Sequence, residues 1–293
     1  MGIGEYMKVL VTGVGGQLGY DVLKELMRRK IDSIGADLQE FDITDYEAAH
    51  SFISKHMPDA IIHCSAYTAV DKAENEPELC RRVNVLGTEN IAKICKEIDA
   101  KMIYISTDYV FPGTGKEFYE VDSPTEPQNI YGQTKLAGEI AVKNILDKHF
   151  IVRISWVFGI NGNNFVKTMM RLGKERSELN IVADQIGSPT YTADLAPLLC
   201  DMVFSDKYGT YHATNEGICS WAEFAQEIFK IAGINSKVNE IPTSKYQTKA
   251  KRPLNSRMSK NSLAKNGFRK LRNWQEGLRD YIQSVGVENK HFI

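Results

Sequence analysis

The chain has 293 residues, of which 43% are hydrophobic and 25% are charged, as is usual for a globular protein of one large domain or two modest ones. Its 36 Lys and Arg residues are balanced by 37 Asp and Glu residues, so charge gives no reason to expect nucleic acid or an anionic membrane as a partner. No apolar run reaches the ~20 residues that span a bilayer, and the N-terminus lacks the apolar stretch of a signal peptide.

The first half of the chain alternates short apolar runs with amphipathic stretches. The apolar runs predict buried strands at residues 8–12, 33–36, 60–64, 102–106 and 150–155. The amphipathic stretches predict helices at residues 19–29, 44–55, 80–98 and 130–146, with Thr44 and Glu47 as a capping box for the second. Strands that alternate with helices form parallel sheets, so we expect an α/β, doubly wound fold of the Rossmann type.

The alternating pattern weakens after Phe158. Helices are predicted at residues 165–174 and 221–232, and prolines interrupt the long connections between them. We therefore expect a dinucleotide-binding domain over residues 1–158. Residues 159–293 are expected to form mainly a smaller, interleaved substrate-binding domain, with some segments returning to the first sheet.

A glycine-rich loop follows the first predicted strand. Gly13, Gly16 and Gly19 have the spacing GxxGxxG and lie where a helix is predicted to begin. Glycines there allow a tight turn and let backbone N–H groups approach a pyrophosphate, which the helix N-terminus also attracts. This loop predicts a dinucleotide site. The alternative is an ordinary glycine-rich turn.

Two carboxylates follow the second predicted strand. Asp37 lies where an acidic residue meets the adenosine ribose of NAD, and it would repel a 2′-phosphate. No arginine follows it directly, although Arg28 and Arg29 are close in sequence. Asp42 could contact the adenine side. As alternatives, Asp37 caps a turn and Asp42 is a solvated loop residue.

Tyr131 and Lys135 form a YxxxK pair on the helix predicted at residues 130–146. Residues four apart share one helix face, so the Lys135 ammonium is expected to stabilise a Tyr131 phenolate. Thr107 follows the strand predicted at residues 102–106, where its hydroxyl could donate to a substrate carbonyl oxygen. The next two residues, Asp108 and Tyr109, could bind sugar hydroxyls. The pattern predicts a proton-transfer site with Tyr131 as its acid; the alternative is a surface Tyr and Lys.

Other reactive residues have plainer interpretations. The five cysteines are odd in number and none are spaced as CxxC, which indicates reduced thiols in a cytoplasmic protein. His63 lies within an apolar strand and is interpreted as a core residue.

Taken together, these motifs resemble the extended short-chain dehydrogenase/reductases, and within them the dTDP-4-dehydrorhamnose reductase family. The segments that carry the resemblance are GVGGQLG, AYTAVDKAENEPE, STDYVFPG, YGQTKLAGE, RISWVFG, GNNFVKTM, DQIGSPT and RPLNSRM. The resemblance implies an oxidoreductase of dTDP-rhamnose biosynthesis that reduces the C4 keto group of a dTDP-4-dehydro-6-deoxy sugar. NADPH would be the coenzyme, with NADH also accepted.

The resemblance also implies roles for single residues. Tyr131 would be the general acid, Lys135 would tune it, and Thr107 would polarise the carbonyl group. The cofactor would be lined by Gly16, Gln17, Leu18, Asp37, Asp42, Ile43, Ala66, Tyr67, Thr68 and Ile105. The sugar nucleotide would contact Thr107, Asp108 and Trp156, and the loop residues Asn163 and Asn164 could join them. On its own, Trp156 is more typical of a core residue.

Some members of this family form Mg²⁺-linked homodimers through glutamates. The corresponding positions here are Asp21 and Asp194, whose side chains are shorter, and the C-terminal segment GVENKHFI offers no clear third ligand. These features argue against a metal-linked dimer, although a homodimer without metal remains open.

Two other functions use similar residues. A nucleotide-sugar epimerase or dehydratase keeps its cofactor bound and uses the same Tyr and Lys; a dehydratase should have a further acidic residue after Asp108, and none is present. A non-catalytic regulatory subunit would bind NADP but would not need Thr107, Tyr131 and Lys135 together. The sequence therefore favours the reductase.

Overall fold

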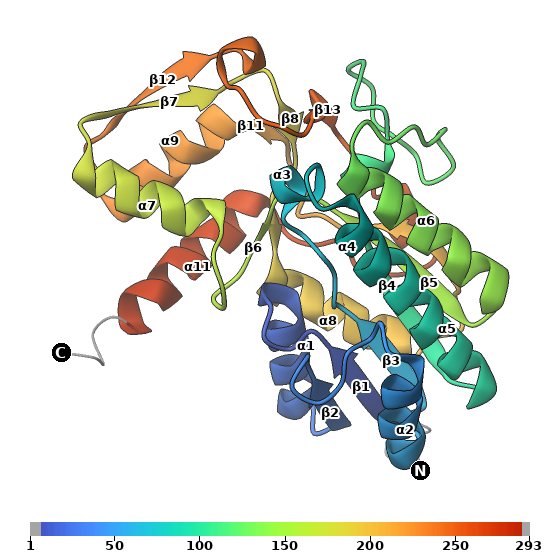
Figure 1. The fold of residues 1–293 in the computed structure, drawn as a ribbon. Coiled ribbons are helices and arrows are strands. Elements are labelled where there is room, and N and C mark those ends of the chain that lie inside the picture. Colours follow the sequence, from blue (N-terminus) through green and yellow to red (C-terminus); the bar gives the residue numbers. More distant parts are fainter. Residues whose placement is uncertain (1–6, 289–293) are drawn as a thin grey trace.

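The computed structural model describes residues 7–288, and a six-stranded parallel sheet lies at its centre (Figure 1). The strand order is β2 (Asp32–Ala36), β1 (Lys8–Thr12), β3 (Ala60–His63), β4 (Lys101–Thr107), β5 (His149–Ile154) and β10 (Gly209–His212). This arrangement confirms the expected Rossmann-type fold. Two expectations lie wholly or mostly outside the described residues. One is the absence of a signal peptide at the N-terminus, and the other is the absence of a third metal ligand in the C-terminal segment GVENKHFI.

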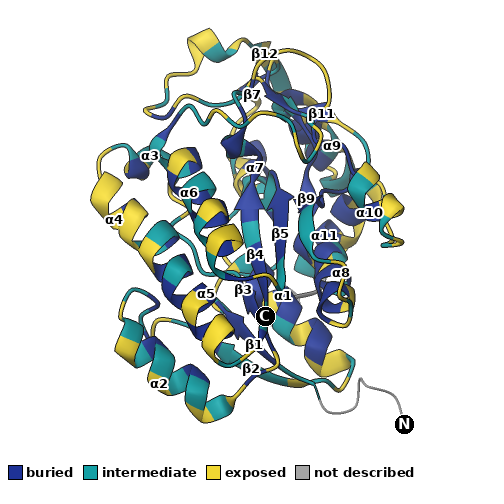
Figure 2. Cartoon of the chain, turned by 90° about the vertical axis from the view of Figure 1, so that its right-hand side faces the viewer, coloured by how far each residue is buried: buried dark blue, intermediate teal, exposed yellow. Residues whose placement is uncertain are grey.

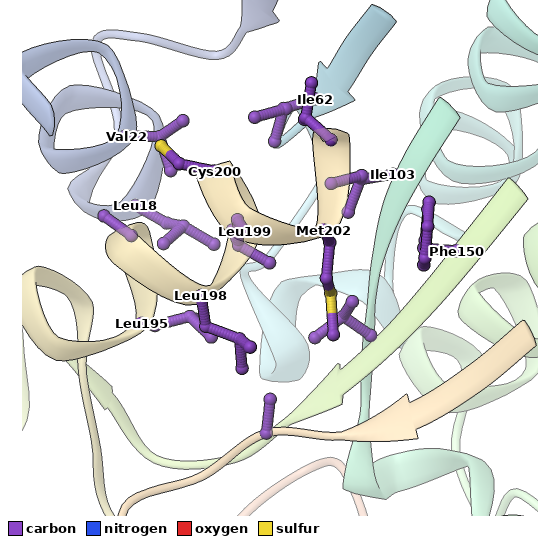
Figure 3. Close-up of a cluster of buried hydrophobic side chains, with 14 of the residues drawn as sticks. Leu18, Val22, Ile62, Ile103, Phe150, Leu195, Leu198, Leu199, Cys200 and Met202 are labelled. Atoms are coloured by element: carbon purple, nitrogen blue, oxygen red, sulfur yellow. The ribbon is translucent and has the colours of Figure 1, made fainter. Parts of the chain in front are cut away.

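Helices cover both faces of the sheet. On one face lie α1 (Gln17–Arg28) and α8 (Thr192–Val203); on the other lie α2 (Tyr46–His56), α5 (Thr88–Glu97) and α6 (Ile130–Ile145). Figure 3 shows Leu18 and Val22 of α1 beside Leu199 and Cys200 of α8 in one buried cluster. The central strands β1, β3, β4 and β5 are largely buried, whereas the outer faces of the helices are exposed (Figure 2).

Three local expectations need revision. The helix expected at residues 80–98 begins earlier and consists of α4 (Pro77–Arg81), a π-helical segment η1 (Arg82–Gly87) and α5. Thr44 does not cap α2: the Asp45 carboxylate accepts a hydrogen bond from the Ala48 N–H, so the helix starts at Tyr46. Helix α8 was not predicted from the sequence, because it contains Pro197.

The second half of the chain forms a separate apolar cluster beyond the carboxyl edge of the main sheet. This cluster joins α7 (Phe165–Glu175), α9 (Trp221–Ala232), α11 (Trp274–Glu288) and the parallel pair β7 (Glu178–Val182) and β12 (Lys237–Ile241), seen at the upper left of Figure 1. The shorter elements of the described chain are α3 (Val70–Ala73), η2 (Asp108–Val110), β6 (Val157–Phe158), β8 (Ile186–Gly187), β9 (Thr190–Tyr191), β11 (Cys219–Ser220), η3 (Thr243–Lys245), β13 (Asn255–Ser256) and α10 (Asn261–Lys265).

The strand order reverses at β1, which has β2 on one side and β3 on the other. The connections that leave β1 and β3 therefore run to opposite sides and open a crevice at their carboxyl ends, where doubly wound folds bind ligands. Gly13 leaves β1 at this point. Among the described residues no helix is long and apolar enough to cross a membrane. All five cysteines are free.

Candidate active site

A cavity of about 580 Å³ opens at the crevice between β1 and β3. Its walls come from the glycine loop, the carboxyl ends of β2 to β5 and the first turns of α6. Most of the candidate residues line it: Gly13, Gly16, Gln17, Leu18, Gly19, Asp37, Asp42, Ile43, Ala66, Thr68, Ile105, Thr107, Asp108, Tyr109, Tyr131, Lys135 and Trp156. Tyr67, Asn163, Asn164, Asp21 and Asp194 lie outside its lining.

The glycine loop is shaped for a pyrophosphate. Gly13 has a φ of +72°, and a Cβ there would lie 2.8 Å from the Ser65 backbone nitrogen. Helix α1 begins after Gly16 with no side-chain cap and no acidic residue in its first turn. The N–H groups and the positive end of this helix therefore face the cavity without an anion of the protein's own, so the residues present fit a dinucleotide.

Both carboxylates after β2 have local partners. The Asp37 carboxylate accepts hydrogen bonds from the N–H groups of Gly15, at 2.8 Å, and Leu38, also at 2.8 Å. Asp42 accepts one from the Thr44 N–H at 2.8 Å. Each carboxylate thus shapes a turn and also lines the cavity. Arg28 and Arg29 are bound to Glu25, and no arginine lines the cavity within the described chain.

Tyr131 and Lys135 lie on the first turns of α6. The Asn129 side chain caps this helix by accepting from the Gly132 N–H at 2.8 Å. Gly132 is required because a Cβ there would lie 2.3 Å from the Tyr109 carbonyl oxygen, so only glycine lets α6 pack this closely. The Tyr109 ring meets the Tyr131 ring edge-on, with centroids 5.5 Å apart.

Both residues reach the cavity wall, where Lys135 is buried and Tyr131 is half-buried. Burial raises the pKa of Tyr131 well above its usual value, and a hydrogen bond with Thr107 opposes this rise. Burial lowers the pKa of Lys135 to about 7, which the nearby Glu139 carboxylate opposes. Burial is thus the largest influence on the pKa of Tyr131, and it favours the protonated form of the phenol.

Beneath the pair lies a buried ion pair. Glu139, one turn after Lys135 on α6, binds the Arg153 guanidinium through two hydrogen bonds of 2.8 and 2.7 Å. Glu139 also accepts from the Ser106 hydroxyl at 2.6 Å. The network joins α6 to β4 and β5 directly below Thr107.

Thr107 is held at the end of β4. Its hydroxyl donates to the Asp108 carboxylate at 3.0 Å and accepts from the Tyr109 N–H at 3.2 Å. Asp108 also accepts from the Ser256 hydroxyl, and burial raises the pKa of Asp108 to about 6. The sequence reasoning did not single out Ser256. The signal was available, because Ser256 lies in the quoted segment RPLNSRM.

Trp156 lines the cavity and also packs against the second cluster. Its indole stacks on Trp221 with ring centroids 3.8 Å apart. Its backbone has a φ of +50°, a left-handed conformation that is uncommon for a bulky residue. Strained backbone of this kind often marks a functional site.

The remaining candidates have structural partners. The Asn164 side-chain amide caps α7 and donates to Gln17 Oε1 at 3.0 Å, which ties the glycine loop to the second cluster. Asn163 is exposed, and the Tyr67 N–H donates to Asn84 at 2.8 Å. His63 is a buried core residue as interpreted: it contacts Thr12 at 2.8 Å, and burial lowers its pKa to about 3.

The two metal candidates are engaged within the protein. The Asp21 carboxylate accepts from the Thr192 hydroxyl, and burial raises its pKa. The Asp194 carboxylate binds Arg272 at 2.8 Å and accepts from Asn215, also at 2.8 Å. Within residues 7–288 no group of three or more His, Cys, Asp or Glu side chains could hold a metal ion.

Comparison with known proteins covers nearly the whole chain. Residues 7–287 match the family model described as "RmlD substrate binding domain". The spore coat polysaccharide biosynthesis protein SpsK of Bacillus subtilis is 39% identical, with 94% of this chain and 97% of that protein aligned. The dTDP-4-dehydrorhamnose reductase of Escherichia coli K12 is 39% identical over 95% of this chain and 98% of its own length. A dTDP-4-dehydrorhamnose reductase of Bacillus anthracis, solved in complex with NADP, is 44% identical, with a TM-score of 0.93 over 95% of this chain and 99% of that one.

Proposed function

This chain belongs to the RmlD substrate binding domain family, and from that premise we propose that it is an NADPH-dependent dTDP-4-dehydrorhamnose reductase. The reaction is the reduction of the C4 keto group of dTDP-4-dehydro-6-deoxy-L-mannose to the alcohol of dTDP-L-rhamnose. One observation carries the proposal: Thr107, Tyr131 and Lys135 line the same cavity as the glycine loop and the N-terminus of α1, which has no side-chain cap.

Tyr131 supplies the proton in this proposal. A bound NADPH would supply the hydride that C4 of the sugar receives. As the carbonyl carbon gains hydride, its oxygen becomes a strong base and takes the proton of the Tyr131 hydroxyl. Because burial raises the pKa of Tyr131, the tyrosine keeps this proton until the developing alkoxide demands it. The Thr107 hydroxyl, which donates to Asp108 in this structure, would turn to donate to the same oxygen and hold it in position.

Lys135 acts after the proton has left. A phenolate at Tyr131 is a buried negative charge, and a protonated Lys135 one turn along α6 offsets it. The Glu139 carboxylate favours that protonated form. Asp108 and Trp156 then hold the sugar: the carboxylate accepts sugar hydroxyls, and the indole covers an apolar face of the ring.

The direct test mixes purified protein with dTDP-4-keto-6-deoxy-L-mannose and NADPH and follows the loss of NADPH absorbance. We expect one NADPH oxidised for each sugar reduced. An epimerase or dehydratase returns the hydride and would convert the sugar with no net loss of NADPH. A regulatory subunit would neither oxidise NADPH nor convert the sugar. Either of these results would reject the proposal.

Both coenzymes should support the reaction. Asp37 suits the free ribose hydroxyl of NADH, whereas the Bacillus anthracis relative was solved with NADP. We expect less than tenfold preference in kcat/KM, or under ~1.4 kcal/mol. Steady-state kinetics with each coenzyme at saturating sugar nucleotide measure the ratio, and exclusive use of one coenzyme would show that the ribose pocket is misread.

Trp156→Ala should raise the KM for the sugar nucleotide by ~10-fold or more, because a lost aromatic contact costs on the order of 1–3 kcal/mol. The Kd for NADPH should barely change. Trp221→Ala, which leaves the Trp156 indole in place but removes its stacking partner, is the matched control. Equal losses of coenzyme and substrate affinity would indicate that Trp156 is a core residue.

A further inference from the structure

Tyr104 of β4 is fully buried and contacts the catalytic helix α6. The Nζ of Lys135 lies over the face of the Tyr104 ring, 4.1 Å from the ring centroid. The Tyr104 hydroxyl donates to the backbone carbonyl oxygen of the same lysine at 3.2 Å. One side chain therefore contacts Lys135 at both ends, at its main chain and at its ammonium group.

The surroundings fix the Tyr104 ring and keep it neutral. A Cβ at Gly138 would overlap the Tyr104 hydroxyl, so glycine at this position lets α6 pack directly onto the ring. The His63 ring stacks with Tyr104 at a centroid separation of 6.1 Å, and burial lowers the pKa of His63 to about 3. Burial raises the pKa of Tyr104 well above its usual range. At neutral pH the ammonium of Lys135 thus faces an uncharged aromatic ring.

The charged form of Lys135 depends on few neighbours. Burial disfavours it and lowers the pKa of Lys135 to about 7. The Glu139 carboxylate favours it, but that carboxylate makes its short ion pair with Arg153, at 2.7 Å, and acts on Lys135 through its charge at longer range. The other titratable neighbours are the thiols of Cys64 and Cys80, which are neutral at pH 7 because burial raises the pKa of both. The aromatic face is therefore the partner in closest contact with the ammonium.

We propose that Tyr104 is a positioning residue for the reduction, whose ring face holds the Lys135 ammonium one helical turn from Tyr131; this inference rests on the proposed function. An aromatic face attracts a cation, and the attraction is stronger away from water. Unlike a carboxylate, the ring carries no net charge, so it leaves the positive charge of Lys135 available to the phenolate that forms when Tyr131 gives up its proton.

The test changes the charge distribution of the ring while keeping its shape. Tyr104→Phe removes the hydroxyl and keeps the aromatic face, and trifluorophenylalanine at the same position weakens the negative charge of that face. The matched control places trifluorophenylalanine at Phe150, a buried ring of β5 that packs with Tyr208 and Tyr211. Carbon-13 NMR of the lysine Cε follows the titration of Lys135 without coenzyme or sugar, and Lys135→Gln identifies its signal.

Tyr104→Phe should leave the proton affinity of Lys135 within about twofold of the wild type. Fluorination of that ring should then lower the proton affinity by about 10-fold, within the range for a cation–π contact away from water. The Phe150 control should change it by less than about twofold. Equal titration of Lys135 in the Phe and trifluorophenylalanine variants, or an equal change in the Phe150 control, would overturn the inference.

The pH profile of kcat provides the second readout. Because the phenolate is stabilised only by protonated Lys135, kcat should fall as the pH rises and this lysine loses its proton. Fluorination at position 104 should move that fall to lower pH, whereas a merely structural role of the ring would leave its position unchanged. An active enzyme whose kcat profile does not move would overturn the positioning role. A shifted titration of Lys135 in a protein with no reductase activity would instead reject the proposed function, since the titration needs no substrate.

Discussion

Replacement of Tyr131 by Phe is expected to lower kcat by at least ~100-fold, the lower end of the contribution of a general acid. The substitution removes one oxygen and leaves the ring, so the edge-on contact with Tyr109 and the packing of α6 should persist. NADPH affinity should therefore stay close to that of the wild type. Single-turnover rates and coenzyme binding by fluorescence measure the two quantities separately.

The matched control is Tyr46→Phe. It also removes a tyrosine hydroxyl, one that donates to Glu97 at 2.6 Å on the far side of α2, and it should leave kcat unchanged. A near-normal rate in Tyr131→Phe would exclude this residue as the acid. If NADPH affinity fell in proportion to kcat, the substitution would have disrupted the structure of the site, and the loss of rate could not be assigned to the missing proton donor.

Glu139→Gln is expected to have the largest effect on stability. Glu139 is fully buried and binds both Arg153 and Ser106, so loss of its charge leaves the Arg153 guanidinium, which is 2% exposed, without a counter-ion. Breaking one side of a buried pair costs about 3–5 kcal/mol. Urea unfolding followed by circular dichroism should show a lower midpoint with an unchanged slope.

The control for this variant is Glu89→Gln, which breaks an exposed i,i+4 pair with Lys93 whose charged atoms are 2.7 Å apart. Pairs of this kind contribute about 0.3–0.5 kcal/mol, so the midpoint should hardly move. Equal urea midpoints for the two variants would show that the Glu139–Arg153 ion pair does not stabilise the fold as its geometry indicates.

Much of the main sheet could be predicted from the sequence, because parallel strands covered on both faces are continuous apolar runs. The expected strand at residues 8–12 and the expected helix at residues 221–232 agree with β1 and α9 to the residue. Strand β10 and helix α8 were not predicted from the sequence. Strand β10 has the sequence GTYH, which is not a continuous apolar run, and α8 contains Pro197, so neither has a clear local pattern.

The site was predictable where its residues are close in sequence. The glycine loop and the Tyr131–Lys135 pair lie within single elements, and their spacing alone indicates a shared face. Contacts between distant segments were not predictable in this way. Ser256 reaches Asp108, and Arg252 reaches Asp71 and Tyr109, only because the chain returns to the carboxyl edge of the sheet after α9. The Trp156–Trp221 stack likewise requires the packing of the second cluster.

The central claim is that one site passes a hydride to C4 of the sugar while Tyr131 protonates the oxygen. The most direct test uses NADPH deuterated at the transferring position, with dTDP-4-keto-6-deoxy-L-mannose as substrate, and locates the label by NMR. The account predicts one deuterium at C4 of the product for each NADPH oxidised, and loss of this transfer in Tyr131→Phe. Conversion of the sugar with no deuterium at C4, or unchanged transfer in Tyr131→Phe, would contradict it.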